Sequence, residues 1–195
     1  MTKNEVKRFL KTHRDKEFSP AKYEYTLFLY KDIEEKMYSL ANIVMPRDKA
    51  EAEASLQKIE EAQTAEDVVR LMRKRSAPYD RLKIVQKAIE MEEETLPYIQ
   101  KRALTNKQDI FIETALKYFL RCKTNCFEWI LENYENFKSE YLKSMLCLVL
   151  GLRGETDMIE FLIKEAERFE REYPNESFDQ GPALAVQELA TRLLR

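Results

Sequence analysis

The chain has 195 residues, with 44% hydrophobic and 35% charged side chains but only three glycines, a composition that favours helix and argues against a sheet, whose turns need glycine. The 33 basic and 35 acidic side chains nearly cancel, which argues against a general nucleic-acid binder because such proteins need a basic excess. We find no apolar run long enough to span a bilayer and no secretory leader at Met1, so we expect a cytoplasmic protein without a membrane anchor.

The N-terminal region, residues 1–76, is predicted to form helices that are either divergent repeats or an added cap. Thr2 and Glu5 have the spacing of a capping box and begin a first helix that runs to about Lys16. Ser19-Pro20 begins a second helix that continues to Val44. Its aromatic side chains favour packing against the rest of the chain over a peptide-binding groove. These side chains are Tyr23, Tyr25, Phe28 and Tyr30.

Two shorter helices are predicted next, from Lys49 to Ala62 and from Ala65 to Arg75, the second capped by Thr64. The second of these helices ends in a basic cluster formed by Arg70, Arg73, Lys74 and Arg75. Cations at a helix C-terminus are expected from the helix dipole, and we favour this explanation over an anion-binding or nucleic-acid-binding patch. Ser76-Ala77-Pro78 then breaks the helix.

Three helical hairpins are predicted after this break, over residues 79–104, 109–137 and 139–173, and one register relates them. Four residues in each second helix read apolar, Pro or Glu, aromatic, and Ile or Leu, at offsets of 31 and then 32 residues. These quartets are Leu96–Ile99, Phe127–Ile130 and Ile159–Leu162. The same offsets align the first helices, for example at Ala88, Phe119 and Gly151. Because its register equivalents Tyr98 and Phe161 are also aromatic, we expect Trp129 to pack in the core or between repeats rather than to stack on a ligand.

A hairpin of this length cannot bury two apolar stripes alone, so we expect neighbouring hairpins to stack and share a core. The segments Leu150–Gly154, Asp157–Leu162 and Gly181–Ala185 resemble HEAT-repeat proteins of the armadillo-like class, in which small residues lie at helix crossings. The resemblance, which covers roughly Tyr79 to the C-terminus, implies an all-α fold, a right-handed superhelix (HEAT/ARM-like solenoid) of stacked antiparallel helix pairs. From the length of the chain we expect a single domain over residues 1–195 rather than two small ones. The segment 181–195, with a last helix from Ala183 that lacks a partner, is interpreted as a terminal cap.

No arrangement of residues indicates an enzyme, a cofactor site or a metal site. Cys122, Cys126 and Cys147 lie in apolar helical surroundings and are expected to be buried, reduced thiols. His13 is expected at the edge of a helical stripe, packed or half-exposed, with no nucleophile beside it. The acidic run that begins at Glu92 is expected to be a solvated helix face.

The leading functional hypothesis is a non-enzymatic protein–protein interaction module, or scaffold. The second helices would line a concave surface for a protein or peptide partner with a basic segment, because carboxylates recur there at helical spacing. The candidate partner-binding residues are Glu128, Glu132, Glu135, Glu160, Lys164 and Glu167. An ordinary solvated face is the alternative interpretation of these residues.

Two other functional hypotheses stay open. Some HEAT-like proteins are DNA glycosylases for alkylated bases, although such an enzyme needs a basic concave face and the face predicted here is acidic. Other relatives attach bilin chromophores, but no motif in this chain supports that activity. The third hypothesis is a structural protein that assembles with itself through the thin apolar stripe of the helix from Lys49 to Ala62.

Overall fold

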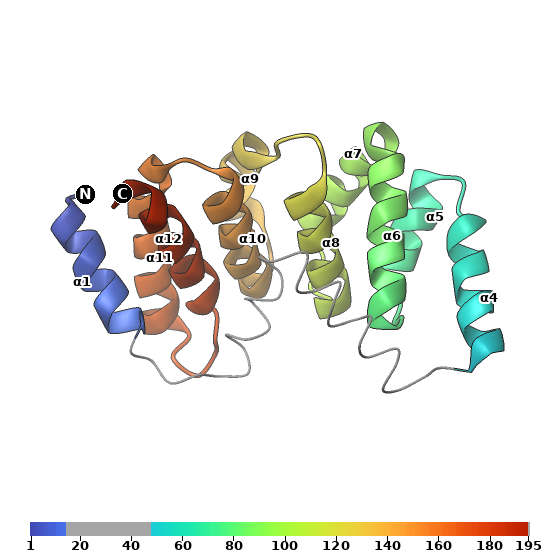
Figure 1. Cartoon of the computed structure of the whole chain (residues 1–195), viewed down its shortest axis with the longest axis horizontal. Helices are drawn as coiled ribbons and strands as arrows, with labels where there is room; N and C mark the ends of the chain where they lie inside the picture. Colours follow the sequence, from blue (N-terminus) through green and yellow to red (C-terminus); the bar gives the residue numbers. More distant parts are fainter. Residues whose placement is uncertain (15–47, 195) are drawn as a thin grey trace. The chain divides into compact units, whose positions relative to one another are not determined.

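The computed structural model describes residues 1–14 and 48–194, and within these ranges the protein is all-helical (Figure 1). These ranges hold ten α-helices, two short 3₁₀-helices and no β-strand. None of the helices in them is both long enough and apolar enough to cross a bilayer. The second predicted helix, from Ser19 to Val44, lies outside the described residues together with its aromatic side chains.

The described residues form two compact units. Unit 1 contains residues 1–14, 126–135 and 140–194, and unit 2 contains residues 48–125 and 136–139. The two helices of the predicted second hairpin, α8 (Asp109–Arg121) and α9 (Phe127–Asn133), therefore belong to different units. We describe each unit by itself.

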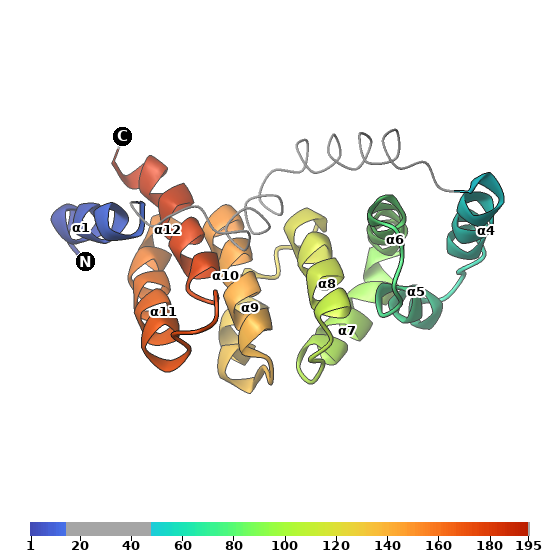
Figure 2. The ribbon, with the colours of Figure 1, turned by 90° about the horizontal axis from the view of Figure 1, so that it is seen from below.

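Unit 2 arranges its helices in two layers, with α4, α6 and α8 in one layer and α5 and α7 in the other (Figure 2). The helices other than α8 are α4 (Lys49–Glu60), α5 (Ala65–Met72), α6 (Pro78–Glu90) and α7 (Glu92–Ala103). Asp48 and Thr64 cap α4 and α5 by accepting from backbone N–H groups three residues on, as the sequence predicts for Thr64.

Helix α5 ends three residues before the predicted end at Arg75. The N–H groups of Arg73 and Lys74 donate to the carbonyls of Arg70 and Leu71, three residues back, at 3.3 and 3.0 Å. Such i to i−3 bonds tighten the last turn and close the helix. The basic cluster is therefore split, with Arg70 inside the helix and the other three side chains beyond it.

Glu92 is buried, so the prediction that it belongs to a solvated face is wrong. It is the first residue of α7, and its carboxylate accepts hydrogen bonds from the backbone N–H groups of Lys123 and Thr124, both at 2.7 Å. Burial by itself raises the pKa of this carboxyl, but the hydrogen bonds from Thr124 and Lys123 outweigh burial and hold the pKa below its usual value. Glu92 therefore fastens the loop after α8 to the start of α7.

We expect Glu92→Gln to lower the free energy of unfolding at neutral pH by about 1–3 kcal/mol, since a neutral amide replaces a charged acceptor of two N–H groups. Because the pKa is lower in the folded state, the carboxylate stabilises the fold above its unfolded pKa, and this stability is lost as the pH falls from about 4.5 through the folded pKa. Urea unfolding across this pH range should show the difference between wild type and variant shrinking. The exposed neighbour Glu93→Gln is the control; an equal effect at Glu93 would contradict the prediction.

Unit 1 also has two layers, with α9 and α11 in one layer and α10 and α12 in the other (Figure 2). Its remaining helices are α1 (Lys3–Arg14), α10 (Glu140–Arg153), α11 (Ile159–Glu172) and α12 (Gln180–Leu193), with 3₁₀ turns η1 (Tyr134–Asn136) and η2 (Thr156–Met158). The capping box is confirmed, since Thr2 Oγ1 accepts from the Glu5 N–H and Glu5 accepts from the Thr2 N–H. Helix α1 packs on α12, although the two lie at opposite ends of the chain.

The last helix differs from its prediction in two ways. It begins at Gln180 instead of Ala183, because Pro182 is tolerated in a first helical turn, where its missing N–H has no partner to lose. It also has partners, since α12 packs against α10, α11 and α1 and buries most of its length. At the crossing of α10 and α12, a Cβ added to Gly151 would lie 2.5 Å from the Cα of Ala185. The small residue there is what allows the close approach.

The predicted register coincides with burial. The fourth residues of the quartets, Ile99, Ile130 and Leu162, are all fully buried, and so are the first-helix equivalents Ala88, Phe119 and Gly151. Trp129 and its register equivalent Phe161 are half-buried, whereas the third aromatic residue of the register, Tyr98, is 52% exposed at the edge of a cleft. The three cysteines are buried, as expected, and none of them forms a disulfide within the described residues.

Candidate functional site

The structure places all six predicted partner-binding residues in unit 1, and all six are exposed. Helix α9 and the η1 turn carry Glu128, Glu132 and Glu135, and α11 carries Glu160, Lys164 and Glu167. Helices α9 and α11 share a layer (Figure 2). We call these six side chains the acidic face.

Ion pairs make the α11 half of the acidic face less negative than the sequence alone suggests. Lys164 Nζ lies 2.8 Å from Glu160 Oε1, and the terminal amine of Met1 lies 3.5 Å from Glu160 Oε2. The hydrogen bond and charge of Lys164 lower the pKa of Glu160. Glu135 is 88% exposed and lies 3.8 Å from the buried Lys143. The carboxylates of the acidic face are exposed and therefore open to a partner.

A groove of about 560 Å³ between α1 and α11 borders the acidic face. Glu160, Lys164 and Glu167 line one wall, and Glu5 and Arg8 of α1 line the other. Sequence reasoning missed this groove, because nothing local in the sequence indicates that the first helix packs at the C-terminal end of the chain. The signal that was available is the unpaired last helix, which required a partner for its apolar side.

His13 lines this groove and is buried. The sequence predicts a packed or half-exposed side chain at this position, and the structure shows the packed arrangement. Its ring stacks on Phe9 with centroids 3.8 Å apart, and its Nδ1 lies 3.0 Å from the Phe9 carbonyl oxygen. Its Nε2 lies 3.3 Å from Glu170 Oε1 of α11. The histidine therefore attaches α1 to α11, and this contact explains its burial.

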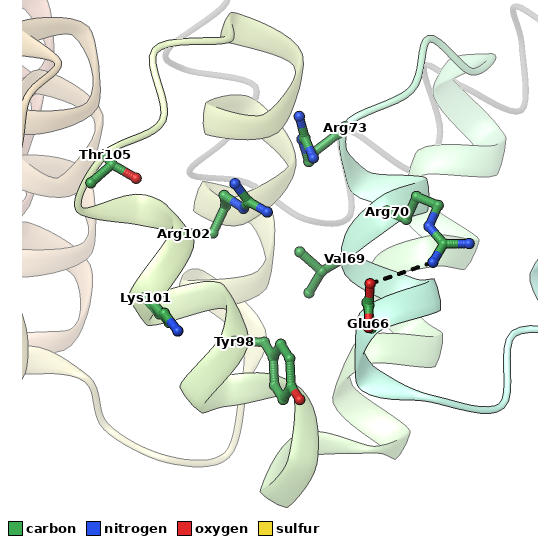
Figure 3. A pocket seen from close by; sticks show the side chains of 8 residues that line it. All are labelled: Glu66, Val69, Arg70, Arg73, Tyr98, Lys101, Arg102 and Thr105. Atoms are coloured by element: carbon green, nitrogen blue, oxygen red, sulfur yellow. Dashed lines mark ion pairs between the residues drawn. The ribbon is translucent and has the colours of Figure 1, made fainter.

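Unit 2 contains a second hollow, a cleft of about 400 Å³ between α5 and α7 (Figure 3). Arg70 and Arg73 of the predicted basic cluster line it from the α5 side, whereas Lys74 and Arg75 do not. Tyr98, Lys101 and Arg102 line it from the α7 side. The sequence analysis did not predict that α5 and α7 lie side by side. A signal was available, because both helices carry basic residues in their last turns and both follow a longer helix in the chain.

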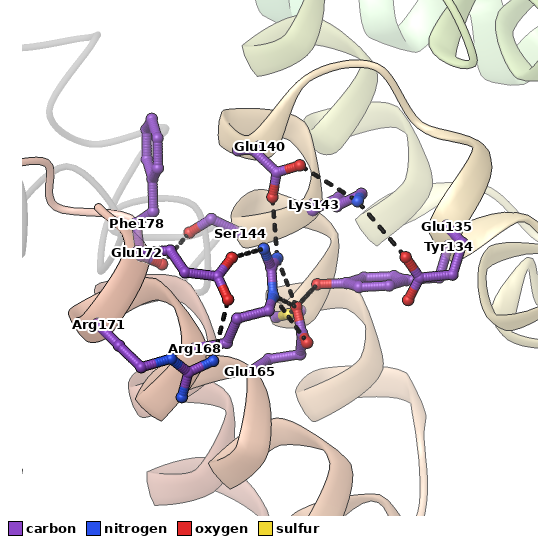
Figure 4. A network of polar contacts seen from close by, with 11 residues as sticks. Tyr134, Glu135, Glu140, Lys143, Ser144, Glu165, Arg168, Arg171, Glu172 and Phe178 are labelled. Atoms are coloured by element: carbon purple, nitrogen blue, oxygen red, sulfur yellow. Dashed lines mark hydrogen bonds and ion pairs between the residues drawn. The ribbon is translucent and has the colours of Figure 1, made fainter.

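A polar network joins the end of α9, α10 and α11 beneath the acidic face (Figure 4). The Tyr134 hydroxyl donates to Glu165 Oε2 at 2.7 Å, and the Arg168 guanidinium donates to Glu165 Oε2 and Glu140 Oε2, both at 2.9 Å. Lys143 Nζ lies 3.2 Å from Glu140 Oε1. Tyr134, Lys143 and Glu165 are buried. Their hydrogen bonds and ion pairs within the network compensate for the loss of contact with water. The network fixes the helices that carry the acidic face.

The protonation states in this network favour a structural role over catalysis. Burial, followed by the proximity of Cys147 and Glu165, raises the pKa of Tyr134 well above its usual value, so the hydroxyl remains a donor. Burial raises the pKa of the Cys147 thiol to about 12, and a protonated thiol is a poor nucleophile. Burial alone would lower the pKa of Arg168, but hydrogen bonds to Glu165 and Glu140 raise it.

The described residues define an all-helical protein built from packed helix pairs. Comparison of the chain with protein-family models, with curated proteins and with solved structures gives no significant match.

Proposed function

We propose that the protein is a non-enzymatic interaction module that binds a basic segment of a protein or peptide partner on the acidic face. One observation carries the proposal: all six residues are exposed on helices of one layer, above a buried network that fixes these helices. A preformed surface loses little conformational freedom on binding, which favours affinity.

The charge of the acidic face supports a basic partner. Five carboxylates and one ammonium give it a formal charge of −4, from five negative charges and one positive charge. Such a surface attracts a basic segment over several ångströms and raises its association rate. The bordering groove supplies apolar contacts from Phe9 and Ile163, against which the methylene stems of lysine or arginine can pack.

We also propose that the helix pairs are HEAT-like repeats that stack in a right-handed superhelix with the second helices on its concave side. The support is the register, whose equivalent positions have the same burial in α6, α8 and α10. Stacking repeats of this kind build extended binding surfaces. The alternative of a DNA glycosylase receives less support, because the candidate face is acidic and a glycosylase must approach phosphates.

Titration of a fluorescent lysine-rich peptide, followed by anisotropy, tests the proposed function. The wild type should bind saturably, and the triple variant Glu128→Gln, Glu132→Gln and Glu160→Gln should bind at least about tenfold more weakly. Binding should also weaken as salt shortens the screening length.

The matched control removes three exposed carboxylates of α4, by Glu51→Gln, Glu53→Gln and Glu60→Gln. This variant has the same net charge as the first and should keep wild-type affinity. Equal losses in both variants would show non-specific attraction and contradict the proposal. Nanomolar binding to alkylated DNA would favour the glycosylase instead, and a concentration-dependent mass in light scattering would favour self-assembly.

A further inference from the structure

We propose that the cleft between α5 and α7 is a second binding site, which takes a small ligand that carries a phosphate group on a planar ring. This site belongs to unit 2 and shares no residue with the acidic face. The observation that carries the proposal is a hollow lined by three cations that have no carboxylate partner among the described residues, next to an exposed aromatic ring. The residues concerned are Arg73, Lys101, Arg102 and Tyr98.

The cations come from both walls of the cleft. Figure 3 shows Arg102 of α7 and Arg73, at the end of α5, on opposite sides, with Lys101 on α7 between Tyr98 and Arg102. In the part of the chain that the structure describes, these three side chains form no ion pair, and the Arg73 Nε–H donates only to Gln108 Oε1, at 3.4 Å. Arg70 differs, since it lies 3.5 Å from Glu66 and 3.4 Å from Asp67. Glu66 also lines the hollow but pairs with Arg70, so the other three cations have no carboxylate partner in the described part of the chain.

This concentration of charge favours an anion with more than one negative charge. Helix C-termini attract cations, which accounts for each basic residue separately. The dipole of each helix does not offset the repulsion between cations that two different helices place around the same hollow. A phosphate monoester dianion would compensate it, and its oxygens match the planar donor pairs of two arginines.

The uncharged residues that line the cleft indicate which chemical group is attached to the phosphate of the ligand. Tyr98 is one of the two large hydrophobic side chains that are exposed among the described residues, and Val69 of α5 lies in the same cleft. A volume of about 400 Å³ is within the range of small-molecule sites and exceeds what inorganic phosphate alone occupies. A planar ring attached to the phosphate can stack on Tyr98. An aryl phosphate and a nucleoside monophosphate share this chemistry.

Isothermal titration calorimetry with phenyl phosphate, adenosine monophosphate and inorganic phosphate tests the site. Phenyl phosphate should bind saturably, and Arg73→Gln and Arg102→Gln should each weaken it about tenfold. Tyr98→Ala should weaken phenyl phosphate by roughly threefold to tenfold and leave inorganic phosphate unchanged. Arg171→Gln, at an exposed arginine of unit 1, is the control for net charge and should have no effect.

Each outcome decides the proposal. Tighter binding of adenosine monophosphate than of phenyl phosphate would identify a nucleotide as the source of the phosphate, and the reverse order would identify an aryl phosphate. No saturable heat with wild type up to about 10 mM of any probe would overturn the site. So would an equal loss in Arg171→Gln. The peptide titration at the acidic face uses other residues, so the failure of one proposal leaves the other standing.

Discussion

Replacing Gly151 by valine is expected to destabilise the protein by about 3 kcal/mol, a large part of the stability of a typical domain. The reason is the crossing of α10 and α12, where a Cβ at this position would lie 2.5 Å from both the Cα and the Cβ of Ala185. One of these atoms belongs to the backbone, so the two helices must separate and lose packing on both sides of the contact. Urea unfolding followed by circular dichroism measures the loss.

The control for this prediction is Ala54→Val, which introduces the same side chain on an exposed side of α4. There we expect only the difference in helix propensity, less than about 1 kcal/mol. A neutral Gly151→Val would contradict the close crossing. Gly151→Ala adds a graded test, because helix propensity favours alanine by about 1 kcal/mol and only a real clash can reverse that sign.

Replacing Arg168 by methionine is expected to cost about 2–4 kcal/mol. Methionine keeps much of the side chain's length but leaves the buried Glu165 without its cation, and Glu140, which is half-buried, then pairs only with Lys143 among the described residues. Removing one partner of a largely buried ion pair is far more costly than removing a surface pair, since the remaining carboxylates stay desolvated. The midpoint of urea unfolding at neutral pH should fall accordingly.

Arg171→Met supplies the matched comparison, because Arg171 is 68% exposed and its single ion pair within the described residues is with the neighbouring Glu172. We expect this change to cost less than about 1 kcal/mol. Adding Glu165→Gln to Arg168→Met should recover part of the loss, since the stranded carboxylate is then neutral. Equal costs at Arg168 and Arg171 would show that the network is a surface feature and does not fix α11.

Local patterns in the sequence predict most of the helices. Thr2 with Glu5, and Thr64, mark helix starts because their side chains accept from nearby N–H groups in any tertiary setting. The repeat register predicts which positions are buried, as at Ile99 and Ile130, because burial follows helical spacing. The end of α5 depends on individual backbone hydrogen bonds, and the start of α12 depends on the tolerance of its first turn for proline. The spacing of apolar residues does not specify either of these boundaries.

The contacts between distant segments could not be predicted from the sequence. Glu92 resembles its solvated neighbours until the loop at Lys123 closes over it, and only the fold brings the two together. The packing of α1 on α12 likewise joins opposite ends of the chain. The exposure of the acidic-face residues was predictable because it follows spacing along single helices, whereas the cleft between α5 and α7 needs two helices side by side.

Carbodiimide cross-linking of the bound lysine-rich peptide, read by mass spectrometry, tests the central claim most directly. The reagent couples a lysine amine of the peptide to a protein carboxylate that is in contact with that amine. Each cross-link therefore identifies a glutamate at the binding site. We predict cross-links concentrated at Glu128, Glu132, Glu135 and Glu167 of the acidic face, and their loss at high salt. Cross-links distributed over all exposed carboxylates, including Glu51 and Glu60 of α4, would contradict a specific basic-segment site on α9 and α11.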